Sequence, residues 1–219
     1  MLEGARAALG SRWDEMVAHA HDTLHREAPK VRDAGLTLAI EDHQDFGSEE
    51  LVELADGLGA HVGIVLDTGN PFAVGEDPVA FTQRALRHIR HVHLKDYVAQ
   101  FTDEGYRLVR CAIGDGCVPF AAIRELLETS PHALAASIEP GALEARHIRV
   151  FTTDWWTGYP PRDAQELGVM LGRLRSRRLD DRADYRTPWE TGASPEAVMA
   201  YERAQVARSF ENLRGRGFI

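Results

Sequence analysis

Four short apolar runs in this sequence each end in a side chain that can bind a metal ion. The closing residues are Glu41, Asp67, His93 and Glu139. Three carboxylates and one imidazole form a mostly oxygen donor set, which suits Mn²⁺ or Mg²⁺, and the histidine also allows Co²⁺ or Zn²⁺. The sequence therefore predicts a divalent-metal site made of these four side chains.

The runs that precede these residues are typical of parallel β-strands, because they are nearly continuous in apolar character. They cover residues 36–40, 62–66, 89–92 and 133–138. The closing residues follow one another at intervals of 26, 26 and 46 positions, and the longest interval includes an insertion. In a βα barrel the carboxyl ends of all strands open on one face, so residues that close successive strands converge there.

Amphipathic or capped segments between and after these runs predict the helices that cover the sheet. Ser48 is the expected N-cap of the second helix, and Ser194 with Pro195 is the expected start of the last. Residues 106–112 are expected to form an inserted strand, residues 114–116 a turn, and residues 179–193 an irregular segment. The expected helices span residues 11–33, 48–58, 77–88, 120–129, 163–178 and 195–214.

Strands alternating with helices predict an α/β fold, specifically a partial (β/α)8 TIM barrel. We expect one domain over residues 1–219, with about four C-terminal βα units followed by C-terminal helices. A complete barrel has eight strands, so the N-terminal strands are expected to be missing from this chain. The alternatives are a second chain that completes the barrel, and an open sheet with the ligand at its rim.

Acidic residues at strand ends can also be solvated, or can pair with nearby lysine and arginine. Four such positions in register favour a shared cation, because unpaired carboxylates at close range repel one another.

Five motifs occur in an order that resembles the sugar phosphate isomerase/epimerase family of xylose isomerase-like TIM barrels. The resemblance covers roughly residues 30–145 and implies that Glu41, Asp67, His93 and Glu139 bind one divalent metal ion. It also implies that Glu41 and Glu139 flank the substrate and exchange its proton. The motifs are Ala-Ile-Glu-Asp-His at 39–43, Leu-Asp-Thr-Gly-Asn at 66–70, His-Val-His-Leu-Lys-Asp at 91–96, Gly-Asp-Gly at 114–116 and Ile-Glu at 138–139.

The implied activity is a metal-dependent isomerase or epimerase of a sugar or sugar phosphate. Removing a proton α to a carbonyl gives an enediolate, whose negative charge a Lewis acid stabilises while a carboxylate moves the proton. Two alternatives stay open. One is a lyase on the same scaffold that dehydrates a cyclitol or a shikimate-like acid, and the other is a non-catalytic barrel fragment.

Three further side chains are expected to bind the substrate. His43 and Lys95 each stand two residues beyond an expected ligand and point the same way if the strand pattern persists; the alternatives are a backbone hydrogen bond for His43 and an ion pair for Lys95. Asn70 stands where many related proteins have histidine. That departure, and the lack of an Asp-x-His pair after His93, argue against the related three-zinc endonuclease.

Arg146 lies beyond the last motif and can hold a phosphate or carboxylate group. The segment 154–162 is rich in aromatic and basic residues, which can stack on a sugar or pack against a helix or a subunit.

Composition restricts the partners. A net charge of −9 gives no basic face for a nucleic acid, and no apolar stretch has the length of a membrane span. Two cysteines outside any metal or disulfide pattern fit a cytoplasmic setting. We therefore expect a small-molecule substrate, no nucleic acid or membrane partner, and either a homo-oligomer or a second chain.

Overall fold

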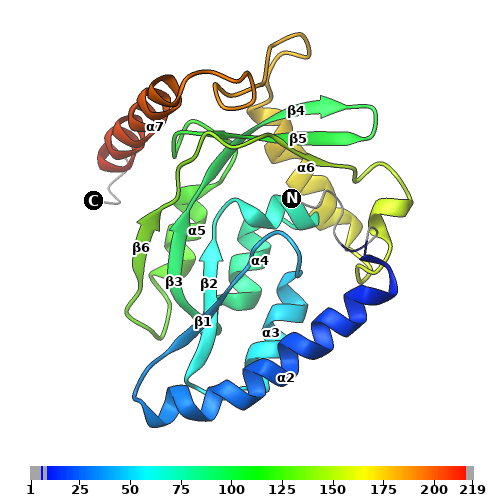
Figure 1. Cartoon of the computed structure of the whole chain (residues 1–219), viewed down its shortest axis with the longest axis vertical. Coiled ribbons are helices and arrows are strands. Elements are labelled where there is room, and N and C mark those ends of the chain that lie inside the picture. The colour runs from blue at the N-terminus through cyan, green and yellow to red at the C-terminus, as the bar shows by residue number, and fades with distance from the viewer. Residues whose placement is uncertain (1–5, 7–8, 216–219) are drawn as a thin grey trace.

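A parallel four-stranded sheet forms the centre of the molecule (Figure 1). The computed structural model describes Arg6 and residues 9–215. The sheet contains β1 (Leu38–Glu41), β2 (Val62–Asp67), β3 (Ile89–Leu94) and β6 (Ala135–Ile138), in that spatial order. Because the spatial order follows the chain order, the sheet has the arrangement of consecutive barrel strands rather than that of a doubly wound sheet. The four predicted strands and their parallel pairing are confirmed.

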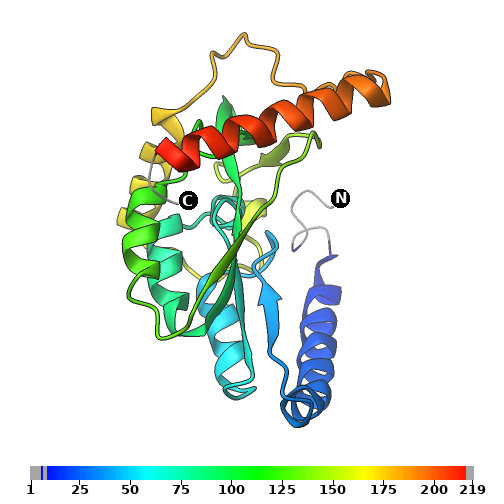
Figure 2. The same cartoon turned by 90° about the vertical axis from the view of Figure 1, so that its left-hand side faces the viewer.

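Helices α3 (Ser48–Asp56), α4 (Pro78–Ala85) and α5 (Phe120–Leu127) lie side by side along one face of the sheet (Figures 1 and 2). A further helix, α2 (Ser11–Asp33), precedes β1 and lies on the other side of β1 from α3 (Figure 2). The short 3-10 segment η2 (Leu86–His88) extends α4 towards β3. Strand β2 lies inside the sheet and is buried along nearly its whole length. Strands β1 and β6 are the edge strands; β1 is half-buried and β6 is largely exposed.

The helix starts follow capping chemistry, with one correction to the sequence prediction. Gly47, not Ser48, is the N-cap of α3, and its backbone N–H donates to the Glu50 carboxylate at 2.8 Å. The Ser48 hydroxyl instead accepts a hydrogen bond from Arg84 at 2.6 Å. At the last helix, α7 (Pro195–Gly215), the Ser194 hydroxyl accepts from the Ala197 N–H at 3.3 Å, as a cap does.

A second, antiparallel sheet is formed by a hairpin inserted between β3 and β6 and by a strand that follows β6. It consists of β4 (Asp96–Thr102), β5 (Gly105–Cys111) and β7 (Arg146–Ile148). The sequence predicted β5 but not β4 or β7. Only Lys95 separates β3 from β4, so the chain passes directly from the parallel sheet into the hairpin at the carboxyl end of the parallel strands (Figure 1).

The buried carboxylate of Asp96 organises the loop that follows the hairpin. It accepts backbone hydrogen bonds from Gly114, Gly116 and Val118 at 2.9–3.0 Å. Gly116 is required here because a Cβ atom would lie 2.3 Å from the Asp96 carboxylate. The Gly-Asp-Gly motif is therefore a tight loop shaped around one anion.

The last two helices complete the fold around the inserted sheet. Helix α6 (Ala164–Ser176) buries Met170 and Leu174, and α7 holds the loop after β5 through Ser209, whose hydroxyl accepts from the Ile113 N–H at 3.0 Å. Residues 179–193 form neither helix nor strand, as predicted. Two 3-10 segments, η1 (Asn70–Val74) and η3 (Asp154–Trp156), complete the elements. Within the described residues, no helix is long and apolar enough to cross a membrane.

Replacing Asp96 by alanine should destabilise the protein by about 3 kcal/mol, because several buried N–H groups lose their acceptor. Urea unfolding measures the change. Asp103→Ala, at the exposed tip of the same hairpin, should change the free energy of unfolding by less than about 0.5 kcal/mol. A loss at Asp96 as small as that at Asp103 would show that the carboxylate does not order the loop.

Candidate metal centre

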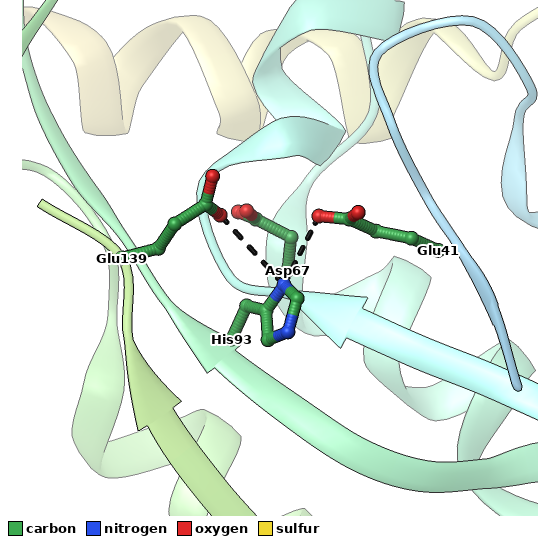
Figure 3. A group of neighbouring side chains, drawn as sticks. All are labelled: Glu41, Asp67, His93 and Glu139. Atoms are coloured by element: carbon green, nitrogen blue, oxygen red, sulfur yellow. Dashed lines mark hydrogen bonds and ion pairs between the residues drawn. The ribbon is translucent and has the colours of Figure 1, made fainter. Parts of the chain in front are cut away.

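The structure brings the four predicted ligands together at the carboxyl ends of the parallel strands (Figure 3). Glu41 and Asp67 are the last residues of β1 and β2, His93 is the penultimate residue of β3, and Glu139 directly follows β6. One donor atom from each lies within 4.8 Å of all the others. The sheet register produces this convergence, since Asp67 and His93 are direct partners across β2 and β3.

Glu41 and Glu139 lie on opposite sides of Asp67 and His93 (Figure 3). The Nδ1 atom of His93 is 3.0 Å from Glu41 Oε1 and 3.7 Å from Glu139 Oε2. The two glutamates are partly exposed and Asp67 is fully buried. The centre thus has a buried floor and two carboxylates at its rim.

The two oxygens of Asp67 have different surroundings. Its Oδ1 accepts hydrogen bonds from the Gly69 and Asn70 N–H groups at 2.9 and 3.2 Å, at the start of η1. Its own backbone N–H donates to the Asp42 carboxylate at 2.6 Å. The turn therefore fixes Asp67 with Oδ2 directed to the centre of the site.

The Lys95 ammonium is the cation nearest to this centre among the described residues. It lies 2.5 Å from Asp67 Oδ2 and 2.8 Å from Glu139 Oε2, and its side chain is 1% exposed. Reciprocal hydrogen bonds with the Thr68 hydroxyl, at 2.8 and 3.0 Å, hold the Lys95 backbone. Lys95 thus forms an ion pair with acids of the site, which was the alternative to a substrate contact. Its ammonium group still lies next to the candidate ligands.

A divalent cation fits this site by charge and by distance. The three carboxylates carry three negative charges and Lys95 one positive charge, so two positive charges would neutralise the cluster. Asp67 Oδ2 and Glu139 Oε2 are buried, and among the described residues neither accepts a hydrogen bond of regular geometry, although Lys95 is close to both. Opposite ligands of an octahedral Mg²⁺ are about 4.2 Å apart, so donors within 4.8 Å need only small side-chain shifts.

Burial controls the protonation of the acids. It raises the pKa of Asp67 to about 7, in spite of the adjacent Lys95. At Glu139 burial acts in the same direction, but interactions with Asp67 and Lys95 override it and lower the pKa to about 2. Burial also raises the pKa of Asp42, next to Asp67. Asp67 therefore holds a proton more readily than Glu139 does.

The other predicted substrate-binding residues lie beside the centre. His43 is exposed and lines a cavity of about 330 Å³ that Glu139 also lines. Asn70 is buried, and its Oδ1 lies 3.4 Å from Lys95 Nζ. The structure therefore groups both residues with the four ligands.

Gln44 is a buried residue of this site that the sequence analysis missed. Its amide nitrogen donates to Asn70 Oδ1 and to the Tyr97 hydroxyl at 2.8 and 3.0 Å. Its backbone has a φ of 64°, which is uncommon for a residue other than glycine and is found at constrained sites. No residue pattern in the sequence distinguishes Gln44 from its neighbours in the loop.

The aromatic segment after β7 packs internally and does not line the cavity. Trp155 is buried and stacks on Tyr159 with ring centroids 4.9 Å apart. Trp156 donates its indole N–H to the Val150 carbonyl at 2.9 Å. Of the two roles considered for this segment, packing is the one that the structure supports.

A parallel βα sheet whose strands follow one another in space, with a candidate metal centre at their carboxyl ends, corresponds to part of a βα barrel. The chain belongs to the family of xylose isomerase-like TIM barrels, whose family model matches residues 3–150. The predicted resemblance to this family is confirmed.

The chain matches only part of the length of its curated relatives. The chain is 32% identical over 93 residues to the uncharacterized protein YihM of Escherichia coli K12, covering 42% of this chain and 28% of that protein. It is 27% identical over 123 residues to inosose dehydratase of Lacticaseibacillus casei, covering 49% of this chain and 41% of the relative. The chain therefore spans less than half the length of these relatives.

Solved structures of the same type are also similar. A xylose isomerase-like TIM barrel protein from Mycobacterium smegmatis, in complex with magnesium, has a TM-score of 0.47 and 17% identity, with 75% of this chain and 52% of that chain covered. The IolI protein with a bound zinc atom has a TM-score of 0.45 and 18% identity, with 75% and 55% covered.

Replacing Glu139 by glutamine should weaken Mn²⁺ binding by about tenfold or more, because a charged ligand is lost at the centre. Electron paramagnetic resonance of free Mn²⁺ in a titration of the chelator-treated protein measures the dissociation constant. Glu144→Gln is the matched control, since Glu144 is an exposed acid that lines the same cavity outside the ligand group. Equal effects of the two changes, or no Mn²⁺ binding by the unchanged protein, would contradict the site.

Proposed function

We propose that this chain acts as a divalent-metal-dependent isomerase or epimerase of a sugar or sugar phosphate. The proposed reaction starts with removal of a proton α to a carbonyl group and proceeds through an enediolate. The proposal rests on one observation above all: Glu41 and Glu139 lie on opposite sides of Asp67 and His93, where the donor atoms of all four converge.

The glutamates are suited to proton transfer. Interactions with Asp67 and Lys95 lower the pKa of Glu139, so its carboxylate is ionised at neutral pH, which is the form that a general base requires. Glu41 stands across the site, where it can return a proton to the other face of the substrate carbon. Removal from one face and return to the other inverts that carbon, whereas transfer between adjacent carbons by one carboxylate interconverts aldose and ketose.

Glu41, Asp67, His93 and Glu139 would hold the metal ion. When bound, a divalent cation supplies Lewis-acid stabilisation of the negative charge that develops on the substrate oxygens. Lys95 contributes a second positive charge, 2.8 Å from Glu139 Oε2. We assign His43, Asn70 and Lys95 to substrate oxygens, because their polar groups adjoin the ligands and can orient a polyhydroxy compound.

Dehydration is the second candidate outcome, and the inosose dehydratases among the relatives favour it. The first step is the same proton abstraction α to a carbonyl. Loss of a hydroxyl group from the adjacent carbon then replaces return of the proton, with an acid donating to the leaving oxygen. The substrate class would be a cyclitol or a shikimate-like acid.

Incubation with Mn²⁺ and a panel of ketoses, aldoses and cyclitol ketones in deuterated water tests the shared first step. We expect deuterium at the carbon α to the carbonyl, detected by NMR. Glu41→Gln and Glu139→Gln, each at saturating Mn²⁺, should slow incorporation by about 10²-fold or more, as loss of a general base does. Glu125→Gln, at an exposed acid on α5 that does not line the cavity, should incorporate deuterium at the unchanged rate.

The same samples separate the two outcomes. An isomer or epimer of unchanged mass supports the first candidate, and loss of one water with a new ultraviolet absorbance supports the second. Absence of deuterium exchange with every sugar and cyclitol tested, from protein shown to contain Mn²⁺, would overturn both.

A further inference from the structure

Two arginines share one face of the inserted antiparallel sheet. Across β4 and β5, Tyr97 pairs with Arg110, and across β5 and β7, Leu108 pairs with Arg146. Directly paired residues point to the same side of an antiparallel sheet, as do residues two apart on a strand. Arg110 and Arg146 are therefore diagonal neighbours on one face.

This face forms a wall of the cavity next to the candidate metal centre. Tyr97, Leu108, Arg110 and Arg146 line the cavity of about 330 Å³ together with Glu139. The opposite face of β5 presents Arg107, whose guanidinium lies 4.7 Å from the ring centre of Tyr185, outside the cavity. Because side chains alternate along β5, Arg110 lies at the cavity and Arg107 lies away from it.

Hydrogen bonds hold both guanidinium groups at the cavity wall. Arg110 Nη1 donates to the Pro140 carbonyl at 3.3 Å, and its Nη2 lies 3.9 Å from Glu139 Oε1. Arg146 Nη1 donates at 2.5 Å to Gln44, whose amide is itself fixed by Asn70 and Tyr97. Positioned donors lose less entropy when they bind a ligand than mobile surface side chains do.

The local charge favours an anion in this cavity. Together with Lys95, a divalent cation would balance the charge of the three carboxylate ligands. Among the described residues, the only other acid that lines the cavity is the exposed Glu144. Two guanidinium groups present forked donors that match the oxygens of a carboxylate or phosphate.

We infer that Arg110 and Arg146 bind an anionic substituent of the substrate, a carboxylate or a phosphate, while its carbonyl end lies at the metal centre. This inference rests on the proposed function and narrows its substrate class to acidic or phosphorylated polyhydroxy compounds. The inserted sheet is then the specificity element of the site.

Calorimetric titration of the Mn²⁺-loaded protein with two matched pairs of probes tests the inference. The pairs are D-ribose 5-phosphate with D-ribose, and D-glucuronate with D-glucose. We expect at least one anionic probe to bind about tenfold or more tightly than its neutral partner, a difference of about 1.4 kcal/mol. The pair that shows the preference identifies the anion as phosphate or carboxylate.

Arginine variants show whether the preference for an anionic probe comes from Arg110 and Arg146 or from the positive charge of the metal ion. Arg110→Met and Arg146→Met should each remove most of the preference, and Arg110→Lys should recover part of it. Arg107→Met, on the same strand but the other face, should leave the preference unchanged. Melting temperature and Mn²⁺ affinity of each variant establish that it is folded and loaded, and Arg110→Lys provides the comparison if Arg110→Met is unstable.

The inference is overturned if neither anionic probe is preferred, or if the preference survives in both methionine variants. Its failure is distinct from failure of the proposed function. Deuterium exchange that is equally fast with neutral and anionic members of a pair would reject the anion site and keep the proton-transfer activity. A preference for the anionic probe that depends on the arginines, without any deuterium exchange, would keep the anion site and reject the proton-transfer activity.

Discussion

Repulsion among three carboxylates at the carboxyl ends of the parallel strands is the constraint around which this structure is organised. Asp67 is fully buried at the end of β2, and Glu41 and Glu139 approach it from the ends of β1 and β6. Ionised groups so placed are unstable without positive charge. The Lys95 ammonium supplies one positive charge, 2.5 Å from Asp67 Oδ2. The cluster keeps a net negative charge that a divalent cation would balance.

Two sheets divide the work of the site between them. The parallel sheet fixes the four candidate ligands, because each closes a strand and the strands end at one edge. The inserted antiparallel sheet adds the wall that bears Tyr97 and both arginines. The Asp96 carboxylate, at the first residue of β4, holds the loop that leads onward to α5. Under the proposed function, the metal ligands lie on the parallel sheet, and the two arginines that would bind an anionic substituent lie on the antiparallel sheet.

The sequence was sufficient for the features that depend on local pattern. Apolar runs predicted the four parallel strands, and the strand-end positions of Glu41 and Asp67 predicted the convergence, because barrel geometry dictates where such residues meet. Strands β4 and β7 were missed, since their pairing depends on distant segments. Gln44 was missed because tertiary hydrogen bonds impose its left-handed backbone. Ser48 was taken for a cap that Gly47 provides, since Arg84 binds the Ser48 hydroxyl.

Anomalous diffraction from a crystal grown with Mn²⁺ tests the central claim most directly. The account predicts one anomalous peak within about 2.0–2.4 Å of an oxygen from each of Glu41, Asp67 and Glu139 and of a nitrogen of His93. It also predicts that Lys95 stays charged beside the filled site. A peak bound elsewhere, or full Mn²⁺ loading with those four side chains still in contact only with one another and Lys95, would contradict it.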